Sequence, residues 1–217
     1  TGDVADDHYH RWKQDVQLMK ALGYKAYRFS LAWPRILPDG RGKVNQPGID
    51  FYNRLIDELL AANIHPLITL YHWDLPTALP GGWLERSTVE AFAEFTATAA
   101  RAFGDRVKQW ATINEPFCAS FLSYKHGRHA PGIQDTRKAL VAAHHVLLAH
   151  GHAVPVLRSE VPGAKVGIVL NEGPFYPATN SKNDLDAARH ADGELNRCLI
   201  DPVYGRHYPA DMLRDYV

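Results

Sequence analysis

Four short apolar segments recur along the chain with room for a helix between them, and this alternation most constrains the fold. They cover residues 25–33, 65–73, 108–115 and 164–171, and each is rich in β-branched or aromatic residues between turn residues or prolines. Such runs are typical of buried parallel strands. Because strands and helices alternate, we expect one parallel sheet with right-handed crossovers.

Helical patterns fill the intervals between these segments. An apolar stripe that ends at a glycine, a proline in a first turn and a Ser-x-x-Glu capping box each predict a helix boundary. The predicted helices are marked by Tyr9, Trp12, Val16 and Met19 before Gly23, by Pro47, by Ser87-Thr88-Val89-Glu90 before Gly104, and by the ranges 137–160 and 184–199.

An open doubly wound sheet and a closed (β/α)8 TIM barrel both fit this alternation. No glycine-rich phosphate loop follows any of the four segments, which counts against a nucleotide-binding sheet. Acidic, amide, histidine and tryptophan side chains instead collect where the strands end, at residues 33–35, 71–74, 114–116 and 171–172. Barrel active sites are built at that end. We therefore predict an α/β barrel in which residues 1–217, as part of one domain, supply about four βα units.

Composition argues against several other classes of protein. Lysine plus arginine and aspartate plus glutamate both number 24, so neither a basic surface for nucleic acid nor an acidic tail is indicated. No stretch approaches about 18 uninterrupted apolar residues, so we expect no membrane span. Cys118 and Cys198 could form one bridge, but isolated buried thiols fit better and favour a reducing, cytoplasmic location.

Glu115 is the residue whose position most suggests catalysis. It ends a predicted strand between Asn114 and Pro116, and the proline restricts the course of the chain beyond it. Glycoside hydrolysis needs a carboxylic acid to protonate the leaving oxygen, and a sugar site also needs hydrogen-bonding groups and aromatic faces. The strand ends carry all three kinds of side chain. The alternative is that Glu115 is a solvent-exposed acid on a loop.

The segment Thr112-Ile113-Asn114-Glu115-Pro116 resembles the acid/base signature of family 1 glycoside hydrolases, the β-glucosidase and β-galactosidase group. Residues 7–11, 28–36, 71–76, 129–132, 201–203 and 208–209 resemble further blocks of that family, in the family's order. The resemblance covers essentially the whole chain. It implies strands two to five of a (β/α)8 barrel, a retaining β-glycosidase with β-glucosides as its default substrates, and no cofactor or metal.

The resemblance also implies a role for each matching residue. Glu115 is the proton donor that later acts as a base. Asn114 donates to the 2-hydroxyl of the sugar, a hydrogen bond that strengthens as charge develops in the transition state. The other implied substrate-binding residues are His72 for the 3-hydroxyl, Trp73 as an apolar wall with its indole N–H, Arg28 as the charge partner of the nucleophile, and Asn171 on the aglycone side.

Each of these residues has a plainer alternative role. His72 fits a core histidine with satisfied hydrogen bonds, Trp33 and Trp73 fit core aromatics, and Arg28 fits an interior ion pair. Asp74, in the same block as His72, fits a brace for its loop.

Two histidine pairs raise the question of a metal. His8 and His10 lie beside acidic residues, and His144 and His145 are adjacent, but neither spacing places two ligands on one face of a helix. A metal-dependent barrel hydrolase is therefore the weakest alternative.

The family's nucleophile lies in a Thr-Glu-Asn-Gly motif, which does not occur in this sequence. Glu172, at the end of the fourth predicted strand, is a substitute by position alone, but the family match puts the nucleophile elsewhere. We therefore expect the chain to function only with the remainder of the barrel, on the same or another polypeptide. The alternative, from another functional class, is a sugar-binding half-barrel that needs a complementary segment.

The sequence also departs from the family pattern at a few places. Ala5 stands where the family usually has cysteine, Cys198 stands at an often aromatic position, and the loop of residues 77–83 looks shorter than usual. The short loop predicts a changed rim near the aglycone.

Overall fold

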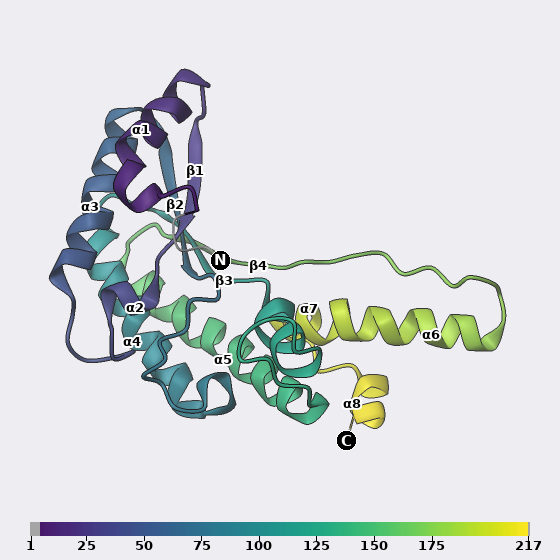
Figure 1. Ribbon diagram of the computed structural model, residues 1–217. Helices are drawn as coiled ribbons and strands as arrows, with labels where there is room; N and C mark the ends of the chain where they lie inside the picture. The colour runs from purple at the N-terminus through teal and green to yellow at the C-terminus, as the bar shows by residue number, and fades with distance from the viewer. Residues whose placement is uncertain (1–4, 217) are drawn as a thin grey trace.

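One parallel sheet of four strands organises the computed structural model, which describes residues 5–216 (Figure 1). The strands lie side by side in chain order as β1 (Ala26–Ser30), β2 (His65–Tyr71), β3 (Gln109–Asn114) and β4 (Lys165–Val169). Ala26 aligns with His65, and Asn114 aligns with Val169. The four strands predicted from the apolar segments are confirmed, although each ends before the last residue of its predicted segment.

Helices alternate with these strands, as expected for βα units. They are α1 (His8–Ala21), α2 (Trp33–Ile36), α3 (Gln46–Ala61), α4 (Arg86–Phe103), α5 (Thr136–Glu160), α6 (Lys182–Asp192), α7 (Cys198–Val203) and α8 (Ala210–Tyr216). Three helical segments of other types lie between these α-helices. They are the 3-10 helix η1 (Gly82–Leu84) and the π-helices η2 (Cys118–Lys125) and η3 (Gly193–Arg197). Gly23 has φ 79° just after α1, which suits the left-handed residue that often follows a helix end.

Two predicted helix boundaries are wrong. The capping box at Ser87 does not form, because α4 begins at Arg86 after Glu85, whose side chain makes no cap hydrogen bond. The Thr88 hydroxyl donates instead to the carbonyl of Gly82, 2.6 Å away in the preceding turn. The helix predicted over 184–199 begins earlier, at Lys182, with Ser181 as its N-cap, and becomes π-helical at Gly193 before α7.

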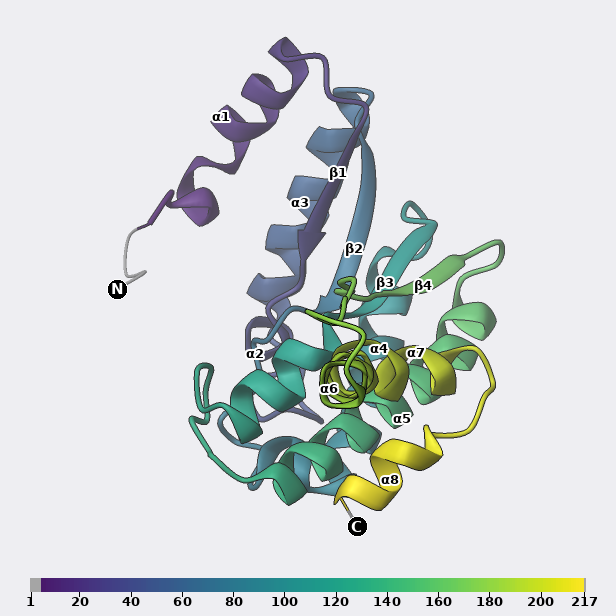
Figure 2. The same cartoon turned by 90° about the vertical axis from the view of Figure 1, so that its right-hand side faces the viewer.

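The helices cover one face of the sheet. α3 packs on β2, α5 packs on β3 and β4, and α4 lies between α3 and α5. The opposite face of β1 and β2 has no helix in front of it in Figure 2, and Arg28 and Lys165 are exposed on that side. The core therefore lies between sheet and helices. Its largest fully buried side chains are Trp33, Trp83, Phe92, Phe95, Phe103 and Phe121.

Helix α5 is long and apolar enough to cross a membrane by length and composition, and no other helix within residues 5–216 is. Its alanines Ala139, Ala142, Ala149 and Ala153 are fully buried, and the helix packs against α4, η1 and η2. Small side chains allow such close packing between helices. We therefore attribute the apolar composition of α5 to its packing in the core.

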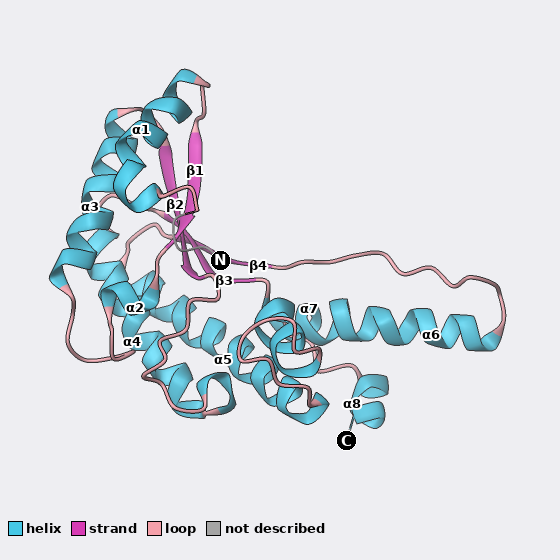
Figure 3. Cartoon of the chain, viewed as in Figure 1, coloured by secondary structure: helices cyan, strands magenta, loops and turns pink. Residues whose placement is uncertain are grey.

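The chain beyond β4, which we call the C-terminal segment (residues 170–216), is arranged differently. A long loop without secondary structure runs away from the sheet, and α6 returns beside it (Figure 3). No side chain of α6 is buried. Arg189 and Arg197 both donate to the carboxylate of Asp211, which ties α6 and η3 to α8.

Candidate active site

Glu115 lies between the end of β3 and the start of η2. Its backbone N–H donates to the carbonyl of Val169 on β4, at 2.8 Å, and its own carbonyl accepts from the N–H groups of Cys118 and Ala119. Glu115 has φ 49°, a left-handed conformation that is uncommon for a residue with a side chain and tends to occur at functional sites. The side chain is half-buried and accepts a hydrogen bond. Glu115 is therefore not the solvent-exposed loop acid of the alternative reading.

Trp73, directly after β2, has the same unusual backbone, with φ 76°. Its indole N–H donates to the carbonyl of Asn114 at 2.9 Å, which joins the ends of β2 and β3. Its ring lies against His72 and His129, with centroids 4.9 and 5.0 Å away. Trp73 is 38% exposed, whereas Trp33 is fully buried in the core. Trp33 is therefore a core aromatic, whereas Trp73 is not. The expected hydrogen bond from the Trp73 indole N–H to a sugar needs correction, because this N–H already donates to the carbonyl of Asn114.

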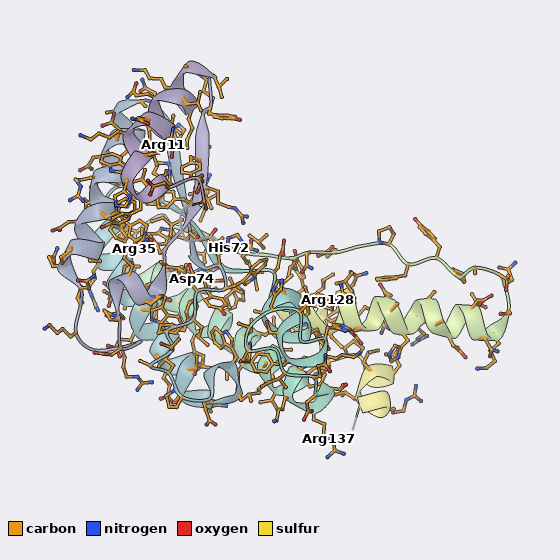
Figure 4. All side chains as sticks on the ribbon, viewed as in Figure 1. Arg11, Arg35, His72, Asp74, Arg128 and Arg137 are labelled. Atoms are coloured by element: carbon orange, nitrogen blue, oxygen red, sulfur yellow. The ribbon has the colours of Figure 1, made fainter. Side chains whose placement is uncertain are left out.

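His72 and Asp74 follow the same strand and lie near Arg35 in Figure 4. Burial lowers the pKa of His72, and the nearby Arg28 lowers it further, while Glu115 and Asp74 oppose the change. His72 is therefore a neutral imidazole at neutral pH, able to donate or accept a hydrogen bond. Because His72 is only partly buried, the reading as a core histidine is wrong.

The carboxyl of Asp74 faces two positive or potentially positive groups. Burial raises the pKa of Asp74, and the charges of Arg35 and His72 act against that rise. The Arg35 guanidinium itself lies over the rings of Tyr9 and Phe51, at 4.7 and 5.2 Å. Arg11, Arg128 and Arg137 lie away from this group in Figure 4. The bracing role of Asp74 stays a prediction.

Two asparagine side chains point buried oxygen atoms into the same region. Asn114 is 2% exposed, and neither its side-chain oxygen nor that of Asn171 has a hydrogen-bond partner within residues 5–216. Buried polar atoms are normally paired, so each is a candidate contact for a polar ligand. The Asn171 amide N–H lies 3.9 Å from the sulfur of Cys118.

Cys118 also belongs to this site, although the sequence did not indicate a functional role for it. The two cysteines are free and buried, as predicted, but the Cys118 thiol also donates to Oε2 of Glu115, with sulfur and oxygen 3.2 Å apart. Burial, together with the adjacent Glu115, raises the pKa of Cys118 to about 12. The available signal was its position three residues after Glu115, at the start of a helical turn.

Arg28 and Glu172 lie toward the two edges of the sheet. Arg28 is exposed on the uncovered face of β1, and within residues 5–216 no carboxylate forms a salt bridge with it, so the reading as an interior ion pair is not supported. Glu172 is exposed beyond β4.

The histidine pairs outside this site have protein partners of their own. His8 contacts Asp15 and His10 contacts Asp7, each at 2.6 Å. His144 contacts the Tyr208 hydroxyl, and His145 contacts the Trp83 carbonyl. Within the described part of the chain, no three histidine, cysteine or acidic side chains come together as metal ligands do.

An apolar cavity of about 380 Å³ lies behind Trp73. The loop of residues 77–83, which looked short in the sequence, contributes Thr77, Leu79 and Trp83 to its wall, and Pro131 lies among the other lining residues.

Comparisons with known proteins place these features in a family. A match to glycosyl hydrolase family 1 spans residues 1–217. β-Glucosidase A of Thermotoga maritima is 48% identical over 223 residues, which cover 100% of this chain and 50% of the relative. A β-glucosidase of an Agrobacterium species is 49% identical over 214 residues, covering 98% of this chain and 47% of the relative.

Solved structures give the same result. A β-glucosidase from Thermotoga maritima in complex with glucoimidazole has a TM-score of 0.96 at 48% identity and covers 100% of this chain and 51% of its own. The virulence factor SghA of Agrobacterium tumefaciens has a TM-score of 0.96 at 49% identity, covering 99% and 48%. The chain thus spans about half the length of the relatives that it matches, and its sheet is part of a (β/α)8 barrel.

Proposed function

Because this chain belongs to glycosyl hydrolase family 1, we propose that it forms the acid/base half of a retaining β-glucosidase. The observation that carries the proposal is the position of Glu115, which ends a barrel strand beside a buried asparagine and a half-exposed tryptophan. Its carboxyl donates a proton to the glycosidic oxygen and, as a carboxylate, later removes one from water.

The neighbouring residues bind the sugar. Asn114 contacts the 2-hydroxyl. Its buried side-chain oxygen, which has no partner among residues 5–214, accepts from that hydroxyl, where the family resemblance implied donation. The neutral His72 binds the 3-hydroxyl. Trp73 supplies an apolar wall, with its N–H engaged by the backbone. Asn171 acts on the aglycone side. The cavity lined by Trp73 gives the leaving group a further apolar surface.

The attacking carboxylate belongs to the remainder of the barrel. In this proposal it displaces the protonated leaving group and forms a glycosyl-enzyme, which water then hydrolyses with net retention. Arg28, exposed on the uncovered face of β1, holds that carboxylate ionised. The outer sides of β1 and β4 carry no neighbouring strand among residues 5–216, and the remaining strands pair there to close the barrel.

The decisive experiment uses the complete protein with both halves of the barrel. Glu115→Gln should slow hydrolysis of β-glucosides with poor leaving groups by about 10²- to 10⁴-fold, because these need protonation as the bond breaks. For activated nitrophenyl glucosides, the rate of forming the glycosyl-enzyme should fall much less, because their leaving groups need little protonation. The matched control is Glu172→Gln, which removes a different carboxyl near the strand ends and should leave the dependence on the leaving group unchanged.

A second test addresses the base role of Glu115. In Glu115→Ala, added azide should restore turnover and give a β-glucosyl azide, since an anion attacks the glycosyl-enzyme without a general base. Equal rates for wild type and Glu115→Gln on poor leaving groups would overturn the assignment. A complete protein that binds glucosides without hydrolysing them would favour a sugar-binding module instead.

A further inference from the structure

We propose that Cys118 is a positioning residue for the acid/base, donating its thiol hydrogen to Oε2 of Glu115 so that Oε1 carries the proton delivered to substrate. This inference rests on the proposed role of Glu115 and assigns a further residue to that same site. The sulfur lies 3.2 Å from Oε2, within the range of a thiol–carboxylate hydrogen bond.

The local backbone places the thiol. Glu115 has a left-handed φ of 49°, and η2 begins directly after it, so Cys118 returns over Glu115 with its N–H on the Glu115 carbonyl at 2.9 Å. Cys118 is 6% exposed. A thiol enclosed in this way has few other acceptors, and its hydrogen is directed to the carboxyl.

A second contact holds the sulfur from the other side. The Asn171 amide, beyond the end of β4, has its nitrogen 3.9 Å from the Cys118 sulfur. The sulfur therefore accepts from Asn171 and donates to Glu115, which links the ends of β3 and β4 through side chains. This contact gives Asn171 a function in addition to its expected place on the aglycone side.

The thiol remains a donor throughout the reaction. Because burial and Glu115 raise the pKa of Cys118 to about 12, the S–H persists at neutral pH. A donor to Oε2 favours the carboxylate over the acid and orients both oxygens. Glu115 interacts electrostatically with His72, which also feels the charges of Arg28 and Asp74, so these residues are left unchanged in every variant compared.

The test measures pH profiles of kcat/KM for the complete protein with Cys118→Ala and Cys118→Ser. Loss of the hydrogen-bond donor to Oε2 should move the alkaline limb for Cys118→Ala up by about half a pH unit. Substrates with poor leaving groups should lose more rate than activated ones. Cys118→Ser keeps a hydrogen-bond donor and should restore the limb. Cys198→Ala removes the other buried cysteine and should leave the limb in place.

The outcomes separate this inference from the proposed function. An active wild type whose alkaline limb is the same in Cys118→Ala overturns the positioning role, while the proposed function stands if Glu115→Gln behaves as expected. If no variant is active, infrared spectroscopy tests the hydrogen bond from Cys118 instead. The S–H band of Cys118 is assigned by its loss in Cys118→Ala. It should shift toward the frequency of a free thiol in Glu115→Ala, and an unshifted band also overturns the inference.

Discussion

The central sheet and the C-terminal segment of this chain are stabilised by different forces. Around β2 and β3, apolar side chains from α3, α4 and α5 fill the space behind the sheet, and Phe92 contacts the rings of Trp33, Trp83 and Phe95. In the C-terminal segment, α6 buries no side chain, and ion pairs to Asp211 join the helices. Buried apolar area contributes stability largely independent of pH, whereas ion pairs depend on protonation.

This difference bears directly on the site. His72, Trp73, Asn114 and Glu115 follow the two central strands and share their well-packed support. Asn171 follows the edge strand β4 and leads into the C-terminal segment. We infer that the end of the site at Glu115 is held firmly by the packed sheet, while the end at Asn171 depends on how the C-terminal segment is held.

The largest expected effect tests the apolar support. Phe92→Ala should lower the free energy of unfolding by about 3–5 kcal/mol, because Phe92 is fully buried and its loss leaves a cavity among aromatic rings. Chemical denaturation of the complete protein measures it. The matched control on α6 is Leu185→Ala, whose side chain is 49% exposed and whose loss should change stability by less than about 0.5 kcal/mol. Equal losses would remove the contrast between the two regions.

Sequence reasoning predicted the parts of the molecule that depend on local pattern. The four apolar runs predicted the strands, and the polar residues after them predicted the site, because parallel strands bring their ends to one edge. The capping box failed because α4 begins at Arg86, so that Ser87 already lies inside the first turn of the helix. The hydrogen bond from Cys118 to Glu115 depends on the left-handed backbone of Glu115, which the residue types in this segment do not predict.

The ion pairs of the C-terminal segment could not be predicted from the sequence either. Arg197 and Asp211 are 14 positions apart, and nothing in their spacing indicates that the guanidinium and carboxylate meet. Only the π-helical turn of η3 and the return of the chain into α8 bring them together.

The next effect tests the ion pairs. Arg197→Met keeps the length of the side chain and removes its hydrogen bonds to Asp211 and Asp192, so α8 should open more easily by about 1–3 kcal/mol. Hydrogen exchange of the α8 amides measures this. Arg206→Met is the control, because Arg206 is exposed and lies 3.8 Å from Asp201. Unchanged exchange in α8 would show that apolar contacts hold it.

Acid should act on the same pairs. The hydrogen bonds from Arg197, followed by those from Arg189, lower the pKa of Asp211 well below its ordinary value. The stability from Asp211 is therefore fully present above the pKa of an unfolded aspartate, about 3.9, and is lost as pH falls toward the lower pKa of the folded state. The protection of the α8 amides, corrected for the slower intrinsic exchange in acid, should fall below about pH 4 before the protection of the α4 amides does. Simultaneous opening of α4 and α8 would contradict separate stabilisation.

The smallest effects distinguish a helix cap from a surface charge within α6. The Ser181 side chain accepts from the N–H of Asp184, so Ser181→Ala should weaken the start of α6 by about 1 kcal/mol. The neighbouring Lys182 pairs with Asp186 at the surface, where water screens the charges, so Lys182→Ala should leave the exchange of α6 amides unchanged. Because α6 buries no side chain, its first turn depends on local contacts, namely the Ser181 cap and the hydrogen bond from Thr179 to Asp184. Faster exchange in Lys182→Ala than in Ser181→Ala would show that charge, and not the cap, holds this part of the C-terminal segment.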